Sequence, residues 1–463
     1  MTSSMKVMIM QIKIKFFVFI SLIILSKLTI SGTIINDDLK ESLEKLYETN
    51  PELSYERELL KSKDELMPQA LSEFRPKISG YYKKGKVDTN SQGFNIAQDN
   101  LRTETYKGVK LTQPIFDGGS SLSNIKEAKN KIISHRFLLK QKEQDIFLDS
   151  IRTYADLATA QTNLFLKKKN FEVLKRRLEL TKEQFDIGEV TLTDVSIAEA
   201  RHLLAQSELI ESEKNVNTLS AKFNYIFGVY PNKPNIILDY KQINLEESLI
   251  EKSSQKNNPR LNDIKYQIKS IRNEIEKIKR KRLPTVKLEG EAYINEGYFK
   301  FDSKREVLSA FATVDIPLYQ SGAASSKIRE TRSKLLSLQS LLKKIKDEIS
   351  YNLISSKSLF DNSLSKIAAY EKQIKSNNIY LDGLKQEMQL GERTMLDLLD
   401  GEQELLQSEL DLALSFKDLF IAYYQTLYHE GKLNAKDLRL SVKHYNVENN
   451  FNKVKGKWLD IIE

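Results

Sequence analysis

The sequence predicts a mostly helical chain in which two long helical hairpins are combined with four β-strands. Long stretches carry apolar residues seven positions apart, and shorter segments alternate apolar and polar residues. Landmark residues also recur at a nearly constant offset, which indicates an internal two-fold repeat. Only 9 prolines and 17 glycines occur in 463 residues, and this favours long helices over a loop-rich fold.

The repeat is visible when one half of the chain is laid over the other. The recurring pairs are Asn50-Pro51 and Asn258-Pro259, Pro76 and Pro284, Pro114 and Pro317, Gly188 and Gly391, Thr191 and Thr394, Asp194 and Asp397, and Gly228 and Gly431. The offset is 208 for the first two pairs and 203 for the others, so its one change falls between Pro76 and Pro114. Two halves that keep register over such a length indicate duplication.

Each half is expected to have one order of elements: a helix, two strands, a long helix, a tight turn and a returning helix. The predicted segments are a signal peptide 1–31, a first repeat 32–228, a linker 229–250, a second repeat 251–431 and a tail 432–463. The first repeat is expected to contain helix 38–71, strands 75–87 and 103–116, and helical hairpin 120–228. The second is expected to contain helix 259–282, strands 283–297 and 307–319, and helical hairpin 323–431.

The outgoing helices, 120–186 and 323–389, show the seven-residue spacing most clearly. Its positions are Leu157, Leu164, Phe171, Leu178 and Phe185 in one half, and Phe360, Ile367, Ile374, Leu381 and Met388 in the other. Such a seam faces a neighbouring helix, as in coiled coils. A helix of about 67 residues reaches about 100 Å, so these helices must pack lengthwise. A coiled-coil scaffold would show the same seams but would explain neither the strands nor the signal.

The strand segments alternate with period two, most clearly in the second half. Val286, Leu288 and Ala292 share one face of strand 283–297, opposite charged residues. A soluble hairpin packed on helices would show the same pattern. Four strands cannot close a barrel with a lumen, whereas three copies would supply twelve. Closure of a transmembrane barrel therefore predicts a homotrimer.

The N-terminus predicts export. Lys13 and Lys15 precede an apolar run, Phe16–Leu25, which is about half as long as a membrane-spanning helix needs to be. A retained N-terminal anchor is the alternative. Removing the four lysines of this segment lowers the net charge from +9 to +5, which argues against a basic nucleic-acid-binding rod.

Nothing in the sequence predicts an enzyme, a metal site or a cofactor. The chain has no cysteine, so disulfides, thiolate metal sites and a cysteine nucleophile are excluded. The four histidines are scattered, and no glycine-rich phosphate loop occurs. We therefore expect no catalytic, metal-binding or cofactor-binding residues.

Three phrases resemble the TolC-like outer-membrane efflux family: Gln-Pro-Ile-Phe-Asp-Gly-Gly at 113–119, Phe-Asp-Ile-Gly-Glu-Val-Thr-Leu-Thr-Asp at 185–194, and residues 390–405. The resemblance covers nearly all of the mature chain. It implies a trimeric exit duct of a tripartite efflux or type I secretion system, with a twelve-stranded barrel in the outer membrane and a periplasmic α-helical tunnel. The implied partners are a periplasmic adaptor, or membrane fusion protein, and an inner-membrane pump or ABC transporter. Drugs, small molecules or proteins would be the cargo. The alternative function is a secreted periplasmic coiled-coil adaptor or structural protein.

Two turns between the helices of the hairpins are candidate functional sites. Gly188 and Gly391 suit left-handed helix ends, and Thr191 and Thr394 suit N-caps. The resemblance implies that these turns form the periplasmic tip, where adaptors dock and the tunnel is gated.

The resemblance also implies roles for four charged residues at these turns. Asp194 and Arg393 match positions that pair between neighbouring hairpins and hold the gate shut, and Asp397 and Asp400 match acidic positions that ring the constriction. The chain departs from the family pattern at Met388, where a tyrosine is expected. The alternative is that these are solvated surface charges.

The junctions between strand and helix are expected to be structural. Pro114 and Pro317 end strands, and glycines then relax the backbone before Ser120 or Ser321 caps the next helix. The glycines are Gly118, Gly119 and Gly322.

A basic run before strand 283–297 has two possible roles. It comprises Lys277, Lys279, Arg280, Lys281 and Arg282. It would hold lipid phosphates at the membrane edge or form a plain solvated helix end. The sequence does not decide whether the tail packs on the tunnel.

Overall fold

The computed structural model describes residues 37–89, 101–230, 234–236, 247–300 and 302–458. The predicted signal peptide and most of the predicted linker lie outside these residues. The described chain is mostly helical and contains one sheet of four strands. In the described part of the chain, no helix combines the length and the apolar character that crossing a membrane requires.

The described elements follow the predicted order in both halves. In the first half they are α2 (Asp37–Thr49), α3 (Pro51–Asp64), α4 (Leu66–Leu71), the 3₁₀ turn η1 (Ser72–Phe74), β1 (Lys77–Asp88), β2 (Leu101–Phe116), α5 (Ser120–Asp186) and α6 (Leu192–Phe227). In the second half they are α7 (Glu247–Asn257), α8 (Pro259–Arg280), β3 (Thr285–Glu296), β4 (Lys304–Asp315), α9 (Ala323–Gln389) and α10 (Met395–Glu430), with α11 (Asn449–Val454) in the tail.

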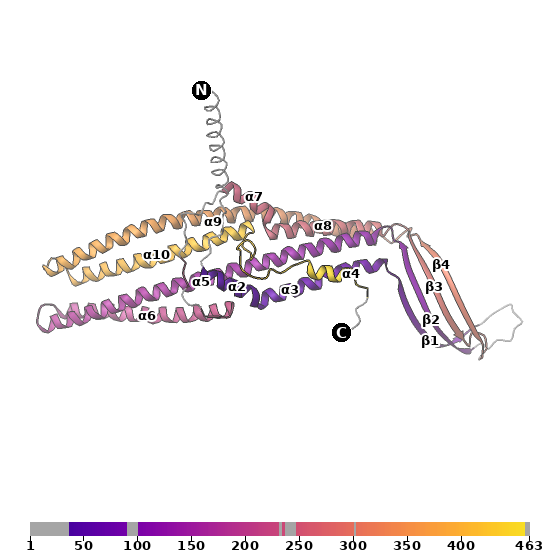
Figure 1. The fold of residues 1–463 in the computed structure, drawn as a ribbon, viewed down its shortest axis with the longest axis horizontal. Helices are drawn as coiled ribbons and strands as arrows, with labels where there is room; N and C mark the ends of the chain where they lie inside the picture. The colour runs from indigo at the N-terminus through magenta and orange to yellow at the C-terminus, as the bar shows by residue number, and fades with distance from the viewer. Residues whose placement is uncertain (1–36, 90–100, 231–233, 237–246, 301, 459–463) are drawn as a thin grey trace, which may run out of the picture.

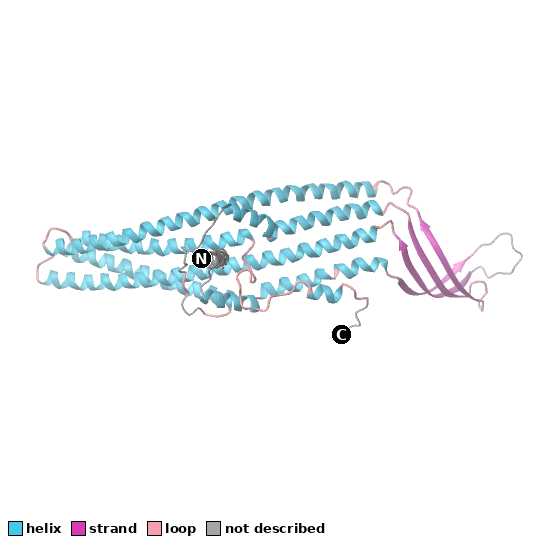
Figure 2. Cartoon of the chain, turned by 45° about the horizontal axis from the view of Figure 1, so that its top comes forward, coloured by secondary structure: helices cyan, strands magenta, loops and turns pink. Residues whose placement is uncertain are grey.

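The molecule is a long rod with helices at one end and the sheet at the other (Figures 1 and 2). The hairpins α5–α6 and α9–α10 lie side by side, and both of their turns reach the end farthest from the sheet. α5 and α9 each have 67 residues, and α6 and α10 each have 36, so the two hairpins match in length.

The single helix expected over 38–71 is wrong, because the structure divides this stretch into α2, α3 and α4. Pro51 lacks an N–H donor and keeps Asn50 extended, so one helix ends and another begins there. The Asn50 side chain caps α3 by accepting a hydrogen bond of 2.9 Å from the backbone N–H of Leu53. Asn258 caps α8 in the same way.

The four strands form one antiparallel sheet in the order β1-β2-β3-β4. They overlap the predicted segments within a few residues at most ends. β4 stops at Asp315, earlier than expected, because Pro317 cannot donate to a ladder. A bulge between Pro114 and Phe116 shifts the register of β2 on β3 next to α5.

The main hydrophobic core lies midway along the rod, where both hairpins and the tail meet. Its largest fully buried side chains include Tyr154 and Phe223 from the first half and Phe420 and Tyr424 from the second. The tail, whose packing could not be decided from the sequence, contributes to the same core and therefore packs on the helices. The buried tail residues are Leu433, Ala435, Leu438 and Leu440.

Candidate functional site

The two hairpin turns have the same backbone geometry. Gly188 and Gly391 both have φ of 79°, the left-handed region that glycine adopts without strain. The N–H of Glu189 donates to the carbonyl of Gln184, and that of Glu392 to Glu387, at 2.9 Å in both turns. These bonds satisfy carbonyls at the ends of α5 and α9, as the sequence predicts.

Each returning helix begins with a capping box. The carboxylate of Asp194 accepts from the backbone N–H of Thr191 at 2.9 Å, and the Thr191 hydroxyl accepts from the N–H of Asp194 at 3.3 Å. Thr394 and Asp397 repeat this arrangement on α10. Bonds from the threonines hold the pKa of Asp194 and of Asp397 below the usual value, so both carboxylates stay ionised at neutral pH.

The other two predicted gate residues have partners within the same copy of the chain. Arg393 donates from Nε to Glu387 at 2.9 Å, within its own hairpin. Asp400 forms an ion pair of 2.6 Å with Arg201, which joins α10 to α6. Sequence reasoning missed Arg201, because no local spacing relates it to Asp400 in the other half of the chain.

A second ion pair joins the hairpins one helical turn or more from the tips. Arg177 of α5 lies 3.0 Å from Glu402 of α10, and their side chains are 17% and 10% exposed. An apolar cluster lies beside this pair. Its buried members are Leu174, Ala205, Met395 and Leu399, and Met388 packs against them. Met388, where the resemblance led us to expect a tyrosine, therefore takes part in apolar packing between the hairpins.

The junction of β2 with α5 is built around Asp117, which the sequence did not single out. Its carboxylate accepts from the N–H groups of Gly119 at 3.0 Å and Ser121 at 2.5 Å. Gly119 is the N-cap of α5, and Gly322 is the N-cap of α9, both left-handed. The expected capping by Ser120 and Ser321 is wrong. Ser120 is already the first residue of α5, and Ser321 comes before the N-cap Gly322 of α9.

The basic run at the end of α8 is partly used in packing. Lys277 reaches the buried carboxylate of Glu127 on α5 at 2.6 Å, and Lys279 pairs with Glu276. Arg280 packs against the glycine turn before α5, where a Cβ on Gly118 would lie 2.5 Å from the Arg280 carbonyl oxygen. Lys279, Lys281 and Arg282 of this run are exposed, whereas Lys277 and Arg280 are partly buried.

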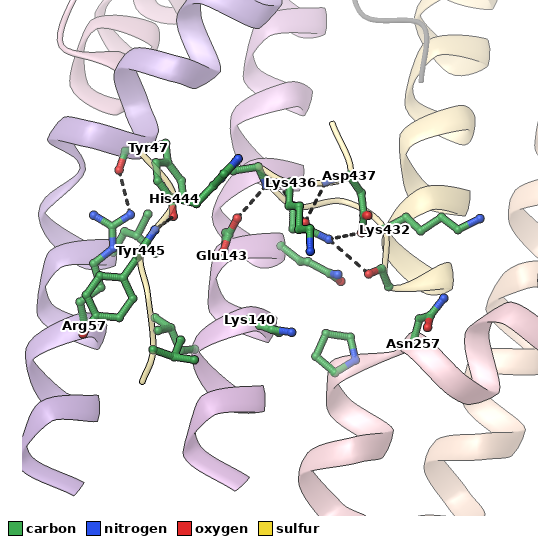
Figure 3. A pocket seen from close by; sticks show the side chains of 18 residues that line it. Tyr47, Arg57, Lys140, Glu143, Asn257, Lys432, Lys436, Asp437, His444 and Tyr445 are labelled. Atoms are coloured by element: carbon green, nitrogen blue, oxygen red, sulfur yellow. Dashed lines mark hydrogen bonds between the residues drawn. The ribbon is translucent and has the colours of Figure 1, made fainter. Parts of the chain in front are cut away.

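A cavity of about 540 Å³ lies midway along the rod, where the tail crosses the helices (Figure 3). Glu143 of α5 points into it and accepts from the backbone N–H of Ala435 at 2.8 Å. Burial raises the pKa of Glu143 above the usual value. Arg57 of α3 lies 4.5 Å from the ring centroid of Tyr47 and 5.4 Å from that of Tyr445 in the tail. These contacts hold the tail in place and arrange no nucleophile with a base.

Among the described residues, no group of three or more His, Asp or Glu side chains could hold a metal ion.

Comparison with known proteins decides the family. Residues 43–228 and 251–425 match the family model described as outer membrane efflux protein. The chain belongs to the outer membrane efflux protein family.

Relatives and solved structures of this family extend over most of the chain. BepC of Brucella suis biovar 1, an outer membrane efflux protein, is 26% identical over 93% of this chain and 95% of its own. Outer membrane protein TolC of Escherichia coli K12 is 23% identical, over 86% and 84%. The solved structure of CusC matches with a TM-score of 0.76 at 11% identity, over 86% of this chain and 93% of that one.

This outer membrane efflux protein is thus a channel component of the bacterial outer membrane, with a periplasmic tunnel, and not an enzyme. The predicted family, function and localisation are confirmed. The alternative of a secreted adaptor has no support from the family match.

Proposed function

We propose that three copies of this chain close into one exit duct, with a twelve-stranded barrel in the outer membrane and a twelve-helix tunnel in the periplasm. The observation that carries the proposal is the open sheet. Within the described residues, β1 and β4 each pair with a strand on one side only. An edge of unpaired backbone groups is not tolerated in lipid, so the sheet requires partners.

The direction of the strands suits closure by identical copies. The four strands run alternately up and down, so β1 and β4 are antiparallel to each other. β4 of one copy would therefore pair antiparallel with β1 of the next, and three copies would complete a barrel. The exposed apolar side chains of these strands would then face lipid or a neighbour. They include Ile78 and Tyr82 on β1 and Leu308 and Val314 on β4, which share one face of the sheet.

We further propose that the chain arose by duplication, since the two halves have equal hairpins and the family model matches twice. The tips would dock a periplasmic adaptor that links the duct to an inner-membrane pump or ABC transporter. Gly188, Thr191, Gly391 and Thr394 shape these tips, and apolar Ile187 and Leu390 are exposed there. The cargo would be drugs, small molecules or proteins. Protein cargo is suggested by one relative, AprF of Pseudomonas aeruginosa, which is named as an alkaline protease secretion protein.

The gate would depend on contacts between hairpins at the tips. In the trimer, Arg393 would leave Glu387 or share it in order to pair with Asp194 of a neighbouring hairpin. The Arg201–Asp400 pair already joins two hairpins of one copy. The carboxylates of Asp397 and Asp400 from three copies would form a ring that attracts cations.

Loss of the charges that hold the gate is expected to open it. Arg393→Ser and Asp194→Asn should each raise single-channel conductance in planar bilayers severalfold. Asparagine keeps an oxygen that can accept from Thr191, so the capping box persists while the charge is lost. Lys385→Ser, which breaks an exposed pair on α9, is the control and should leave conductance unchanged. Unchanged conductance in both gate variants would contradict the assignment.

Neutralising the acidic ring should weaken block of the channel by trivalent cations. The double variant Asp397→Asn/Asp400→Asn is expected to need about tenfold more cation for half-block, because a charged constriction concentrates counterions. The matched control is Asp361→Asn/Asp411→Asn, which removes two carboxylates from the same hairpin away from the tip. Equal block in the ring variant and the wild type would remove the ring from the proposal.

Assembly and conduction can be tested together. The protein purified in mild detergent should have the mass of a trimer, and the same preparation should conduct ions in a lipid bilayer. A monomer without conductance would end the proposal.

A further inference from the structure

The C-terminal tail returns along the rod to the base of the sheet. α11 lies beside α3 and near α4 (Figure 1). Asn450 donates to the carboxylate of Asp64 at 2.9 Å, Glu448 pairs with Arg136 at 3.1 Å, and Val454 is buried. This segment is therefore a docked part of the fold, with a defined position next to the strands.

The tail places the only tryptophan of the chain at the junction of helix and strand. The guanidinium of Arg75 donates to the carbonyl of Lys457 at 2.7 Å and lies 4.7 Å from the ring of Trp458. Arg75 comes two residues before Lys77, the first residue of β1. The carbonyl of Phe74 in turn accepts from Gln113 of β2 at 2.9 Å. Trp458 is thus connected to the start of β1 through Arg75, and to β2 through the neighbouring Phe74. Even so, Trp458 is 67% exposed.

The surroundings of Trp458 are basic. Residues 449–458 include Lys453, Lys455 and Lys457 and no acidic residue. Lys77 is exposed at the start of β1, and Lys281 and Arg282 are exposed before β3, which starts at the same end of the sheet as β1. An exposed indole on a lysine-rich segment is a combination that tolerates a boundary between water and lipid.

We propose that residues 449–458 are an interfacial anchor, which lays Trp458 and its lysines on anionic phospholipid headgroups at the periplasmic face of the outer membrane. The inference rests on the proposed function in one respect, namely that the strands span the membrane. The base of β1 then lies at headgroup level, where an indole is favoured and each lysine is attracted to lipid phosphate. The tail would fix the depth of the duct in the membrane.

Because Trp458 is the sole tryptophan, its fluorescence reports this position without any label. The assembled full-length protein is reconstituted into phosphatidylcholine vesicles with and without phosphatidylglycerol. We expect a blue-shifted emission, strong quenching by lipids that carry a quencher near the headgroup, and weak quenching by aqueous acrylamide. These effects should be larger with phosphatidylglycerol and should decrease in high salt.

Charge reversal separates the anchor from a general effect of charge. Lys453→Glu/Lys455→Glu should shift the emission to the red and remove most of the lipid quenching in phosphatidylglycerol vesicles. Lys168→Glu/Lys175→Glu is the matched control, since both lysines are exposed on α5 in the half nearer the tips. This control should quench as the wild type does.

Each other outcome has a definite meaning. Vesicles that conduct ions while Trp458 stays open to acrylamide and unquenched by lipid would overturn the anchor and leave the channel intact. A blue-shifted emission already present in detergent, insensitive to phosphatidylglycerol and to charge reversal, would show that a neighbouring protein surface covers Trp458, and would also overturn it. Absence of both conduction and lipid quenching would remove the channel proposal and the anchor with it.

Discussion

Replacing Arg177 with methionine is expected to destabilise the paired hairpins by about 3–5 kcal/mol. Arg177 and Glu402 are 3.0 Å apart and largely buried between α5 and α10. Without Arg177, the Glu402 carboxylate stays in a poorly solvated position, and its Oε2 atom already lacks a hydrogen-bond partner among the described residues. A buried charge without its counter-ion is the costly state, more so than the loss of the pair itself.

The double variant Arg177→Met/Glu402→Met tests this reason. It should recover most of the lost stability, because two apolar side chains can join the cluster of Leu174 and Leu399. Arg260→Met is the control: it breaks a pair with Glu348 that is exposed, so it should cost about 1 kcal/mol or less. Chemical unfolding in detergent, followed by the circular dichroism of the helices, measures all three. Equal losses in the single and double variants would contradict the argument.

The long hairpins could be predicted closely because their signals are local. The seven-residue seam marks the helices, and a glycine followed by a threonine marks each turn. α5 and α9 accordingly have the predicted bounds of 120–186 and 323–389. The break at Pro51 is equally local, because Asn50 caps the helix that Pro51 begins, and it divides the single helix expected over 38–71. The Thr-x-x-Asp spacing of both capping boxes was also present in the sequence.

The contacts that join the hairpins could not be predicted from one sequence. Arg201 and Asp400 come from opposite halves of the chain, as do Arg177 and Glu402, and no periodicity relates such partners. The path of the tail is unpredictable for the same reason. Its apolar residues are few and irregularly spaced, and their burial depends on a groove that exists only once both hairpins are packed. Local patterns therefore determine the elements, and contacts between the two halves of the chain determine how the hairpins are joined.

The same dependence across the repeat makes the central core sensitive to a single change. Phe420→Ala is expected to cost about 3–5 kcal/mol of stability, the range for truncating a buried phenylalanine. Phe420 of the second half is fully buried and stacks on Tyr154 of the first half, with ring centroids 6.3 Å apart. The tail packs into this core through Leu433. A cavity here removes contacts from both hairpins and the tail at once, since the neighbours can close it only partly.

The comparison variant is Tyr55→Ala on α3, where the aromatic ring is exposed, and it should change stability by no more than about 0.5 kcal/mol. Because Phe420 connects the two halves, its loss should lower the unfolding midpoint of the whole molecule in one cooperative step, with proteolysis of both hairpins accelerated together. Accelerated cleavage confined to α9 and α10 would instead show that the halves fold independently and that the shared core does not couple them. Two halves coupled through one aromatic stack would form a rigid middle section, so movement at the tips would have to arise beyond it, in the segments joined by the Arg177 and Arg201 ion pairs.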